Sequence, residues 1–457
     1  MQNDTSPVDE IPPLGKMATP GLQHVLIMYV ETIAIPMILG NSMGLSLNDI
    51  ALLINANLLI CGVATLIQTI GFWKFGARIP LIQRCSFIAL TSMIIIGHQY
   101  GITYIFGAVI ACGALTILIA PVFSRLLRFF PPVVIGSLIM IIGISLIPAA
   151  ARWLGGGNPA AADFGSLPDL GLGLATMIIT LTVYVLFSGF MANSSILIGL
   201  VGGTLIALIT GQTDFSSVST ASWFALIKPF EFGLPQFSPA PIILMFIAMI
   251  IIMAETTNTS METGKLIEQK ITPETLASTF RSNGLSTMLG GIFNSFPCDT
   301  FMQNTGFTAL TGVKSRHVVA CSGLILILLG SSPKLAAIIA ALPPPVPGGV
   351  FVIMFGMVTI TGVRQLARVR YEGTRNTIIV AVSLGVGLLP MSFPTLFSGI
   401  TGPFKIIVGS GTFMGAFTAV ILNALLNGPK SKEKEHILKE NADIYNIDDS
   451  AVISARG

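Results

Sequence analysis

Residues 303–312 read QNTGFTALTG, a polar stretch interrupted by glycine within a chain whose other segments are strongly apolar. Hydrocarbon offers no water to satisfy loose backbone groups or amides. Irregular polar backbone at membrane depth must therefore be buried in protein or line a cavity. In transporters, interrupted segments of this kind form the binding site near the middle of the bilayer. The stretch predicts such a cavity inside a multi-spanning membrane protein.

The composition of the whole chain agrees with a membrane location. The chain has 457 residues, of which 53% are hydrophobic and 10% charged, and its mean hydropathy is +0.83. Soluble proteins carry about 25% charged residues. The uncharged runs 171–213 and 232–254 exceed the roughly 20 residues that span a bilayer. The small net charge of +3 gives no reason to expect a nucleic-acid partner.

Apolar runs predict an all-α integral membrane protein with fourteen transmembrane segments. The predicted spans lie near 22–40, 50–72, 79–96, 102–120, 132–150, 172–189, 193–210, 241–257, 276–293, 301–313, 317–341, 347–362, 376–392 and 403–426. Two of them are interrupted by polar residues. The third contains Gln83-Arg84-Cys85-Ser86, and the tenth contains the stretch at 303–312.

The basic residues predict how these spans are oriented. With both termini inside, the inner loops carry Lys74, Arg78, Arg125, Arg128, Lys265, Lys270, Arg281, Lys314, Arg316, Arg364, Arg368, Arg370 and Arg375. The outer loops carry only Arg152, Lys228, Lys334 and Lys405. Because Lys and Arg concentrate on the cytoplasmic side, both termini are expected in the cytoplasm. We expect a multi-pass protein of the cell inner (plasma) membrane, whose tails 1–20 and 428–457 hold no core.

An internal repeat relates the two halves of the chain. Residues 131–143 read PPVVIGSLIMIIG, and residues 344–356 read PPVPGGVFVIMFG. An offset of 213 residues aligns their paired prolines, and it also aligns Gly143 with Gly356. These segments are the fifth and twelfth predicted spans, seven apart, so the two halves must cross the membrane in opposite senses. Inverted repeats of this kind are typical of transporters. The two interrupted spans are partners under the same scheme.

The eighth predicted span ends in an acidic residue. Glu255 follows a 23-residue uncharged run, and an acid at that depth is a functional hypothesis by default. The alternative is that Glu255 merely begins the inner loop. Gln303 and Asn304 each offer an amide donor and acceptor that match the imide edge of a purine or pyrimidine. Asn304 has an alternative role in bracing the local backbone.

The third span offers two further candidates for the site. Ser86 supplies a hydroxyl group, and Phe87 supplies an aromatic face for stacking, with ordinary packing as the alternative for Phe87. No phosphate-binding loop, metal cluster or hydrolytic triad is visible in the sequence. We therefore expect no enzyme activity, no metal and no cofactor. The arginine cluster at 364–375 is expected to contact anionic membrane lipid.

The pattern Gln-Asn-x-Gly-x-x-x-x-Thr-Gly at 303–312 resembles the signature of the nucleobase–ascorbate transporter family, also called nucleobase:cation symporter-2. Glu255-Thr-Thr, Gln23-His24 and Ser86-Phe87 also match, and the similarity covers most of 15–427. The resemblance implies seven-plus-seven inverted spans, with short strands on the broken spans three and ten. It also implies a core domain that moves against a gate domain, commonly in a homodimer.

The same resemblance implies the domain boundaries. They are a cytoplasmic tail at 1–20, core domain at 21–120 (spans 1–4), gate domain at 121–235 (spans 5–7), core domain at 236–342 (spans 8–11), gate domain at 343–427 (spans 12–14) and a cytoplasmic tail at 428–457. Glu255 resembles the glutamate that binds the base. Gln303 resembles the residue that reads the purine edge, where uracil carriers usually have Glu and ascorbate carriers Pro. The backbone around Phe87 and Met302 is implied to donate main-chain hydrogen bonds.

Two departures from the family pattern concern the driving ion. Purine members usually carry acids where this chain has Thr259 and Asn283. We hypothesise that Glu31 or Asp299 supplies part of the missing charge, because burial favours the neutral form of a carboxyl group and so allows proton uptake. The alternative is that Glu31 only hydrogen-bonds in the core and Asp299 lines an exit. His24 is either a proton carrier or a structural histidine.

The sequence thus predicts a proton-driven secondary active importer of xanthine or uric acid, working by an elevator-like movement of the core domain. Protonation would occur at Glu255 or its surroundings. Alternatives within the same class are a uracil or other nucleobase symporter, a sodium-coupled carrier, or an anion exchanger. Alternatives of another class are a passive channel, a membrane sensor and a membrane-embedded enzyme.

Overall fold

A computed structural model describes residues 6–126, 130–213, 215, 218–219, 221–400 and 403–428. The first half contains α1 (Leu14–Ser42), α2 (Leu47–Ile70), β1 (Gln83–Cys85), the 3-10 helix η1 (Phe87–Ala89), α3 (Leu90–Tyr100), α4 (Ile102–Leu126), α5 (Pro132–Leu154), α6 (Leu167–Leu186), α7 (Phe190–Asn193) and α8 (Ser195–Ile209). The second half contains α10 (Pro239–Ile267), α11 (Pro273–Ile292), β2 (Cys298–Thr300), α12 (Met302–Thr311), α13 (Arg316–Gly330), α14 (Pro333–Ala340), α15 (Pro345–Leu366), α16 (Arg375–Ser392), η3 (Pro394–Phe397), α17 (Pro403–Gly409) and α18 (Gly411–Leu426).

The helices have the length and composition of a multi-pass membrane protein. Within the described residues, eight helices are long and apolar enough to cross a bilayer, or nine if α13 and α14, bent by 76°, form one span. Each of the other five predicted spans overlaps a helix that is too short or too polar for that test. The predicted total of fourteen therefore stays a prediction.

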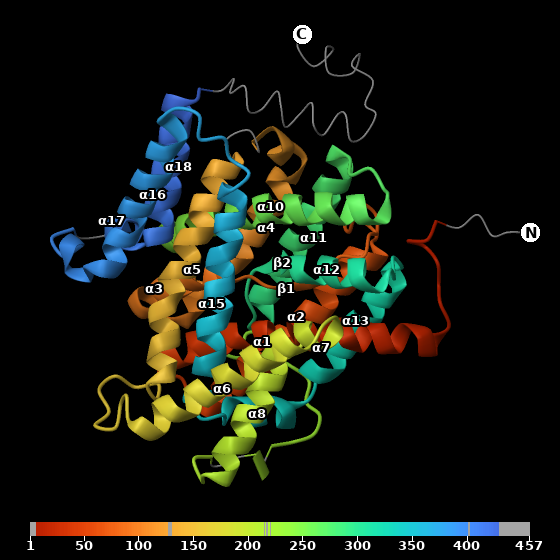
Figure 1. Ribbon diagram of the computed structural model, residues 1–457. Coiled ribbons are helices and arrows are strands. Elements are labelled where there is room, and N and C mark those ends of the chain that lie inside the picture. The colour runs from red at the N-terminus through yellow and green to blue at the C-terminus, as the bar shows by residue number, and fades with distance from the viewer. Residues whose placement is uncertain are drawn as a thin grey trace, which may run out of the picture.

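The helix starts explain why the internal repeat is visible in the sequence. Pro132 begins α5 and Pro345 begins α15, at equivalent positions of the two repeats. Proline suits the first turn of a helix because the backbone N–H it lacks would have no partner there. α5 and α15 pack along each other and lie side by side in Figure 1.

Two predicted boundaries were wrong. α10 continues ten residues beyond the predicted end at 257 and finishes at Ile267, so Glu255 lies inside a helix and does not begin a loop. α1 begins at Leu14, so residues 14–20 of the predicted N-terminal tail are helical. Val8 is buried, and its carbonyl accepts a hydrogen bond from the backbone N–H of Arg316. The second predicted tail, from residue 429 onward, lies outside the described residues.

The helices pack mainly within two groups. The first helix group comprises α1–α4 and α10–α14 with both strands, and the second comprises α5, α6, α8, α15, α16 and α18. In the first group α2 packs on α13 and α4 packs on α11. Both helix pairs meet at glycines. A Cβ atom added to Gly62 would lie 2.5 Å from the carbonyl oxygen of Gly323. A Cβ atom added to Gly284 would lie 2.7 Å from the carbonyl oxygen of Gly113. The backbones touch, so larger side chains are excluded there.

Strands β1 and β2 form an antiparallel pair in the middle of the molecule (Figure 1). Their register pairs Gln83 with Thr300, Arg84 with Asp299, and Cys85 with Cys298. Cys85 and Cys298 are 213 residues apart, which is the offset of the internal repeat. Equivalent residues therefore face each other at this one pair, as expected if a two-fold axis passes between them.

Candidate functional site

A cavity of about 380 Å³ lies between the two helix groups. Its size falls within the roughly 300–1,000 Å³ typical of small-molecule sites. Its lining combines apolar side chains with charges and amides. It is formed by Arg84, Phe87, Ile88, Ile139, Ile142, Glu255, Glu262, Met302, Gln303, Gly306, Met357, Val358, Thr361, Arg364, Gln365 and Arg368.

Four residues singled out from the sequence line this cavity: Phe87, Glu255, Met302 and Gln303. Gln303 is exposed, and within the described residues its amide has no hydrogen-bond partner. The Glu255 side chain is half-buried, and its carboxyl group forms a hydrogen bond with that of Asp299. Polar groups at membrane depth normally find partners. The Gln303 amide is therefore free to bind a ligand, and the Glu255 carboxyl group has acceptor sites beyond its contact with Asp299.

Each of the two strands is followed by a helix that starts at the cavity wall: η1 follows β1, and α12 follows β2. Ser86 caps η1, because its hydroxyl oxygen accepts a hydrogen bond from the backbone N–H of Ile88 at 3.4 Å. α12 starts at Met302 without a side-chain cap, and it ends at Gly312 with φ +68°. Helix N-termini carry partial positive charge and unpaired N–H groups. Both starts can therefore donate main-chain hydrogen bonds into the cavity.

Asp299 lies behind the cavity wall at the centre of a buried hydrogen-bond chain. Its carboxylate accepts from the Ser86 hydroxyl at 3.3 Å, the Thr256 hydroxyl at 3.0 Å and the Thr300 backbone N–H at 2.7 Å. The Asn283 amide donates in turn to the Thr256 hydroxyl at 2.9 Å. Asn283, noted in the sequence as an unusually neutral position, thus belongs to the support of Asp299.

An electrostatic interaction links the carboxyl groups of Glu255 and Asp299. The Asp299 carboxylate accepts hydrogen bonds from three donors, whereas the partner of the Glu255 carboxyl group is Asp299 itself. The Thr259 hydroxyl donates to the Glu255 backbone carbonyl at 3.2 Å, and not to the Glu255 carboxyl group. Like charges close together favour protonation of one partner. The arrangement can therefore hold a proton beside the cavity.

Arg84 is a site residue that the sequence reasoning did not select. Its Nη1 atom lies 2.9 Å from Oε2 of Glu31, and both side chains are almost fully buried. Its guanidinium carbon lies 4.9 Å from the centre of the Phe301 ring and 5.6 Å from that of Phe87. The signal was present: a basic residue inside an interrupted apolar span is itself a functional hypothesis.

His24, Asn304 and Glu31 do not line the cavity. His24 and Asn304 meet behind it, where the Asn304 amide donates to the His24 backbone carbonyl at 3.5 Å. The buried His24 ring packs edge-on against the Phe307 ring, with the two ring centres 4.9 Å apart. Neither nitrogen of the His24 ring has a hydrogen-bond partner within the described residues. Glu31 reaches the site only through Arg84. The predicted residues are thus neighbours, but they belong to two layers.

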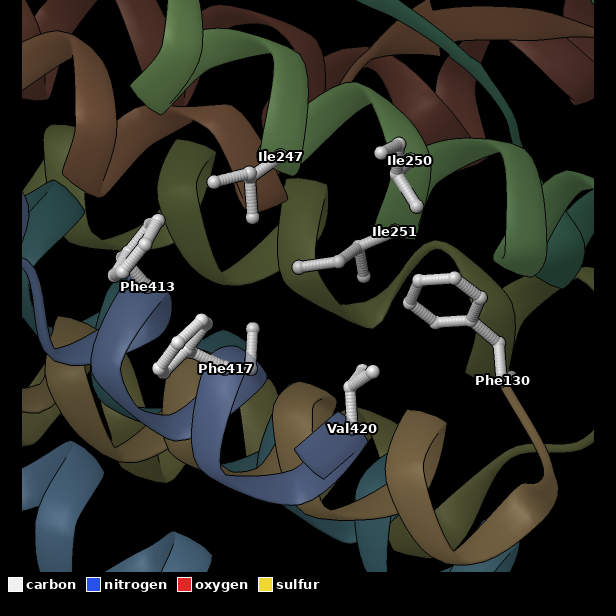
Figure 2. Close-up of a pocket in the computed structure, with 8 residues that line it drawn as sticks. Phe130, Ile247, Ile250, Ile251, Phe413, Phe417 and Val420 are labelled. Carbon is white, nitrogen blue, oxygen red and sulfur yellow. The ribbon is translucent and has the colours of Figure 1, made fainter. Parts of the chain in front are cut away.

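A second cavity, of about 150 Å³, lies between α10 and α18. Figure 2 shows Ile247, Ile250 and Ile251 on one side facing Phe413 and Phe417 on the other. Its lining is entirely apolar, so it has no group with which to orient a polar ligand. Among the described residues, no group of three or more His, Cys, Asp or Glu side chains is arranged to hold a metal ion.

Comparison with known sequences assigns the family. A model of the "Permease family" matches residues 15–396. A xanthine permease of Bacillus subtilis (strain 168) is 41% identical over 413 residues, covering 90% of this chain and 94% of that protein. The uric acid transporter UacT of Escherichia coli (strain K12) is 40% identical over 430 residues, covering 93% and 89%.

Solved structures of other membrane proteins share the fold. The transmembrane domain of a cyanobacterial bicarbonate transporter, BicA, matches with a TM-score of 0.57 at 15% identity, covering 90% of this chain and 99% of that chain. The murine anion transporter Slc26a9 in its inward-facing state matches with a TM-score of 0.60 at 12% identity, covering 92% and 70%. The chain belongs to the permease family, as its resemblance to nucleobase:cation symporter-2 proteins predicted, and it is a multi-pass membrane transporter, not an enzyme.

Proposed function

We propose that this protein imports an oxopurine nucleobase, xanthine or uric acid, by secondary active transport coupled to protons. The observation that carries the proposal is the Gln303 amide, which has no hydrogen-bond partner within the described residues, together with the Glu255 carboxyl group in the same cavity, which is large enough for one base. The printed names of the relatives at about 40% identity, a xanthine permease and a uric acid transporter, support the same substrate class.

The chemistry of the lining matches an oxopurine. The Gln303 amide offers one donor and one acceptor direction to the alternating C=O and N–H groups of the base. The Glu255 carboxylate accepts from ring N–H groups, and hydrogen bonds to a charged partner are the stronger kind. Phe87 offers an aromatic surface beside them. Ile139 and Ile142 of α5 provide an apolar wall on the opposite helix group.

We assign the coupling proton to the Glu255–Asp299 pair in preference to Glu31 or His24. Glu31 already has a buried cationic partner in Arg84, which favours its ionised form. Glu255 and Asp299 interact with each other, and only Asp299 is stabilised by several donors. A proton shared by this pair would neutralise charge next to the substrate. Coupling requires that the loaded and empty forms differ in how readily they change conformation.

The proposal includes an elevator-like movement of the first helix group as the core against the second as the gate. We also propose fourteen spans in two halves that cross the membrane in opposite senses, with spans three and ten interrupted. Its supports are the packing within two groups and the register that sets Cys85 opposite Cys298. We further propose a homodimer in the plasma membrane with both termini in the cytoplasm.

The direct test is uptake of radiolabelled xanthine, uric acid and uracil into cells that express this chain, compared with cells carrying an empty vector. We expect saturable uptake of xanthine, uric acid or both, abolished by a protonophore and unchanged when external sodium is replaced by choline. Sodium-dependent uptake would transfer the coupling to sodium. Non-saturable flux would indicate a channel, and saturable uptake of neither oxopurine would overturn the proposal.

A further inference from the structure

We propose that Arg84 contacts the substrate and selects the oxopurine in its monoanionic form, so that uric acid is preferred over xanthine. This inference rests on the proposed function and adds a residue and an ionisation state to it. Sequence similarity does not decide the matter, because the xanthine permease and the uric acid transporter are 41% and 40% identical to this chain.

The first support is the geometry of the Arg84 side chain. It lines the cavity that holds Glu255 and Gln303, yet the residue is only 6% exposed. A guanidinium group has five N–H donors in a planar fork. Within the described residues, Nη1 alone has a hydrogen-bond partner, and the buried Nε has none. A cation with donors left over at a cavity wall is suited to an anionic ligand.

The second support is how the guanidinium is held. Glu31 fixes one edge of the fork at 2.9 Å, and the Phe87 and Phe301 rings lie within 6 Å of its centre, at 5.6 and 4.9 Å. Arginine stacks favourably on aromatic faces, which restricts its rotamers. Glu31 is therefore a positioning residue in this scheme. The remaining edge is presented in a fixed direction, so little entropy is lost when a ligand binds.

The third support is the charge of the lining as a whole. Three arginines, Arg84, Arg364 and Arg368, line the cavity with two glutamates, Glu255 and Glu262. Arg368 and Glu262 are paired with each other at 3.3 Å. Arg84 is paired in the same way with Glu31, so once the Glu255–Asp299 pair holds one proton, three arginines are balanced by three carboxylates and an anionic ligand meets no net negative charge. An anion can therefore accept charge-assisted hydrogen bonds from the unused donors of Arg84, and a neutral base would gain less from them.

The two candidate substrates differ in this property. Uric acid has one more ring carbonyl than xanthine, and this carbonyl helps to delocalise the charge left when a ring N–H ionises. Uric acid is accordingly a monoanion at neutral pH, whereas xanthine is largely neutral. The alternative role for Arg84 is purely structural, joining β1 to α1 through Glu31. A structural role would affect both substrates alike, so the ratio of their affinities separates the two explanations.

The experiment measures binding of radiolabelled uric acid to the purified full-length protein in detergent, with unlabelled uric acid or xanthine as competitor. The variants are Arg84→Gln, Glu31→Gln and the double variant with both changes. The double variant removes the buried charges as a pair and so avoids the strong destabilisation expected when one partner is left alone. Thermal unfolding of each variant shows whether it is folded.

For the wild type we expect uric acid to compete at least about tenfold better than xanthine, the effect of losing one charge-assisted hydrogen bond. In Arg84→Gln and in the double variant this ratio should fall to near one. In Glu31→Gln it should stay the same or rise, because the arginine loses its competing carboxylate. If Arg84→Gln does not fold, the double variant decides.

Repeating the competition at an alkaline pH that ionises xanthine adds a control. Uric acid keeps its charge at both pH values. A change in the ratio of the two affinities therefore reflects ionisation of xanthine, because titration of the protein affects the binding of both ligands. Xanthine should gain on uric acid in the wild type and not in the double variant. Equal loss of both affinities in Arg84→Gln, or a wild-type preference for xanthine, would overturn the inference and leave the proposed function standing. Absence of wild-type binding to either base would instead remove the proposed function.

Discussion

The two cavities between the helix groups differ in almost every chemical respect. The larger one, of about 380 Å³, meets the strand pair and carries Arg84, Glu255 and Gln303. The smaller one, of about 150 Å³, lies beside α10 as well but has an entirely apolar lining, as Figure 2 shows. One helix therefore faces the second group through a polar surface at Glu255 and through a purely apolar surface at Ile247–Ile251.

The difference suggests a division of labour along a single interface. Directional hydrogen bonds fix a ligand in one orientation, and they are lost when the donor and acceptor move apart. Apolar contacts are non-directional and depend mainly on the area buried. The polar cavity is therefore suited to recognition, and the apolar one to a contact that survives small sliding movements. Substitutions in the first should change affinity and specificity, and substitutions in the second should change rates or stability.

The largest effect is expected for Glu255→Gln. The change removes the charged acceptor for ring N–H groups and one half of the carboxyl pair, so transport should fall by about 100-fold or more, as for loss of a charged hydrogen bond. The measurement is initial uptake of radiolabelled uric acid and xanthine, normalised to protein in the membrane. Wild-type uptake by Glu255→Gln would show that the polar cavity does not depend on this carboxyl group for transport.

Glu268→Gln is the matched control, because Glu268 follows the end of the same helix. Its carboxylate bonds Lys314 at 2.7 Å, and this contact holds the pKa of Glu268 below its usual range. A depressed pKa means that the contact stabilises the fold above the unfolded pKa and is lost only as the pH falls through the folded value. Near neutral pH the control should keep wild-type uptake and wild-type pH dependence.

A smaller effect is expected for Gln303→Glu, which replaces the amide donor by a second acceptor. Affinity for oxopurines should fall by about tenfold, the consequence of one unpaired polar group. The ranking of uracil among competitors should rise. Inhibition of uptake by a panel of unlabelled bases measures both changes. Gln303→Asn keeps the amide but shortens the side chain, so a change confined to Glu would point to charge as the cause.

Thr256→Val tests the layer behind the polar cavity. Valine has the same shape but leaves Asp299 without one donor and Asn283 without its acceptor. We expect a loss of about 1–3 kcal/mol in stability, because both groups are buried. Thermal unfolding in detergent measures the loss. Thr256→Ser keeps the hydroxyl group and should have the stability of the wild type. If valine is tolerated without loss, the chain of hydrogen bonds does not support the site.

The smallest effect is expected in the apolar cavity. Ala416→Leu adds methyl groups beside Ile251 and Phe417, and filling a cavity typically stabilises by about 0.5–2 kcal/mol. The KM for substrate should stay unchanged, and the maximal uptake rate should shift by no more than about threefold, or roughly 0.7 kcal/mol. Uptake at several substrate concentrations separates the two parameters. A large change in KM would show that the two cavities are not independent.

Much of this site was accessible from the sequence, because membrane burial makes polar residues conspicuous. Glu255, Phe87, Met302 and Gln303 were predicted, and all four line the cavity. Their roles in binding remain predictions. The long apolar runs located the helices, since lipid imposes long apolar segments on any spanning helix.

What the sequence concealed depends on contacts between distant segments. Arg84 was noticed only as an interruption, since nothing in its neighbourhood indicates a carboxylate 53 residues earlier, at Glu31. The end of α10 was misjudged because Glu255 and the polar residues after it resemble a loop, although several of them, such as Thr256 and Thr259, are buried. The apolar wall from α5 and α15 has no sequence signal, because its residues match ordinary lipid-facing ones.

The strand register has a consequence for how many ways a ligand can bind. A two-fold axis between Cys85 and Cys298 turns the pair Arg84–Asp299 into the pair Pro297–Ser86, which carries no charge. Two identical halves would instead build the same environment twice, as the self-complementary contact of a symmetric dimer does. A ligand on such an axis would have two equivalent poses. Because the charges lie on one side only, we expect a planar and asymmetric ligand to bind here in one preferred pose.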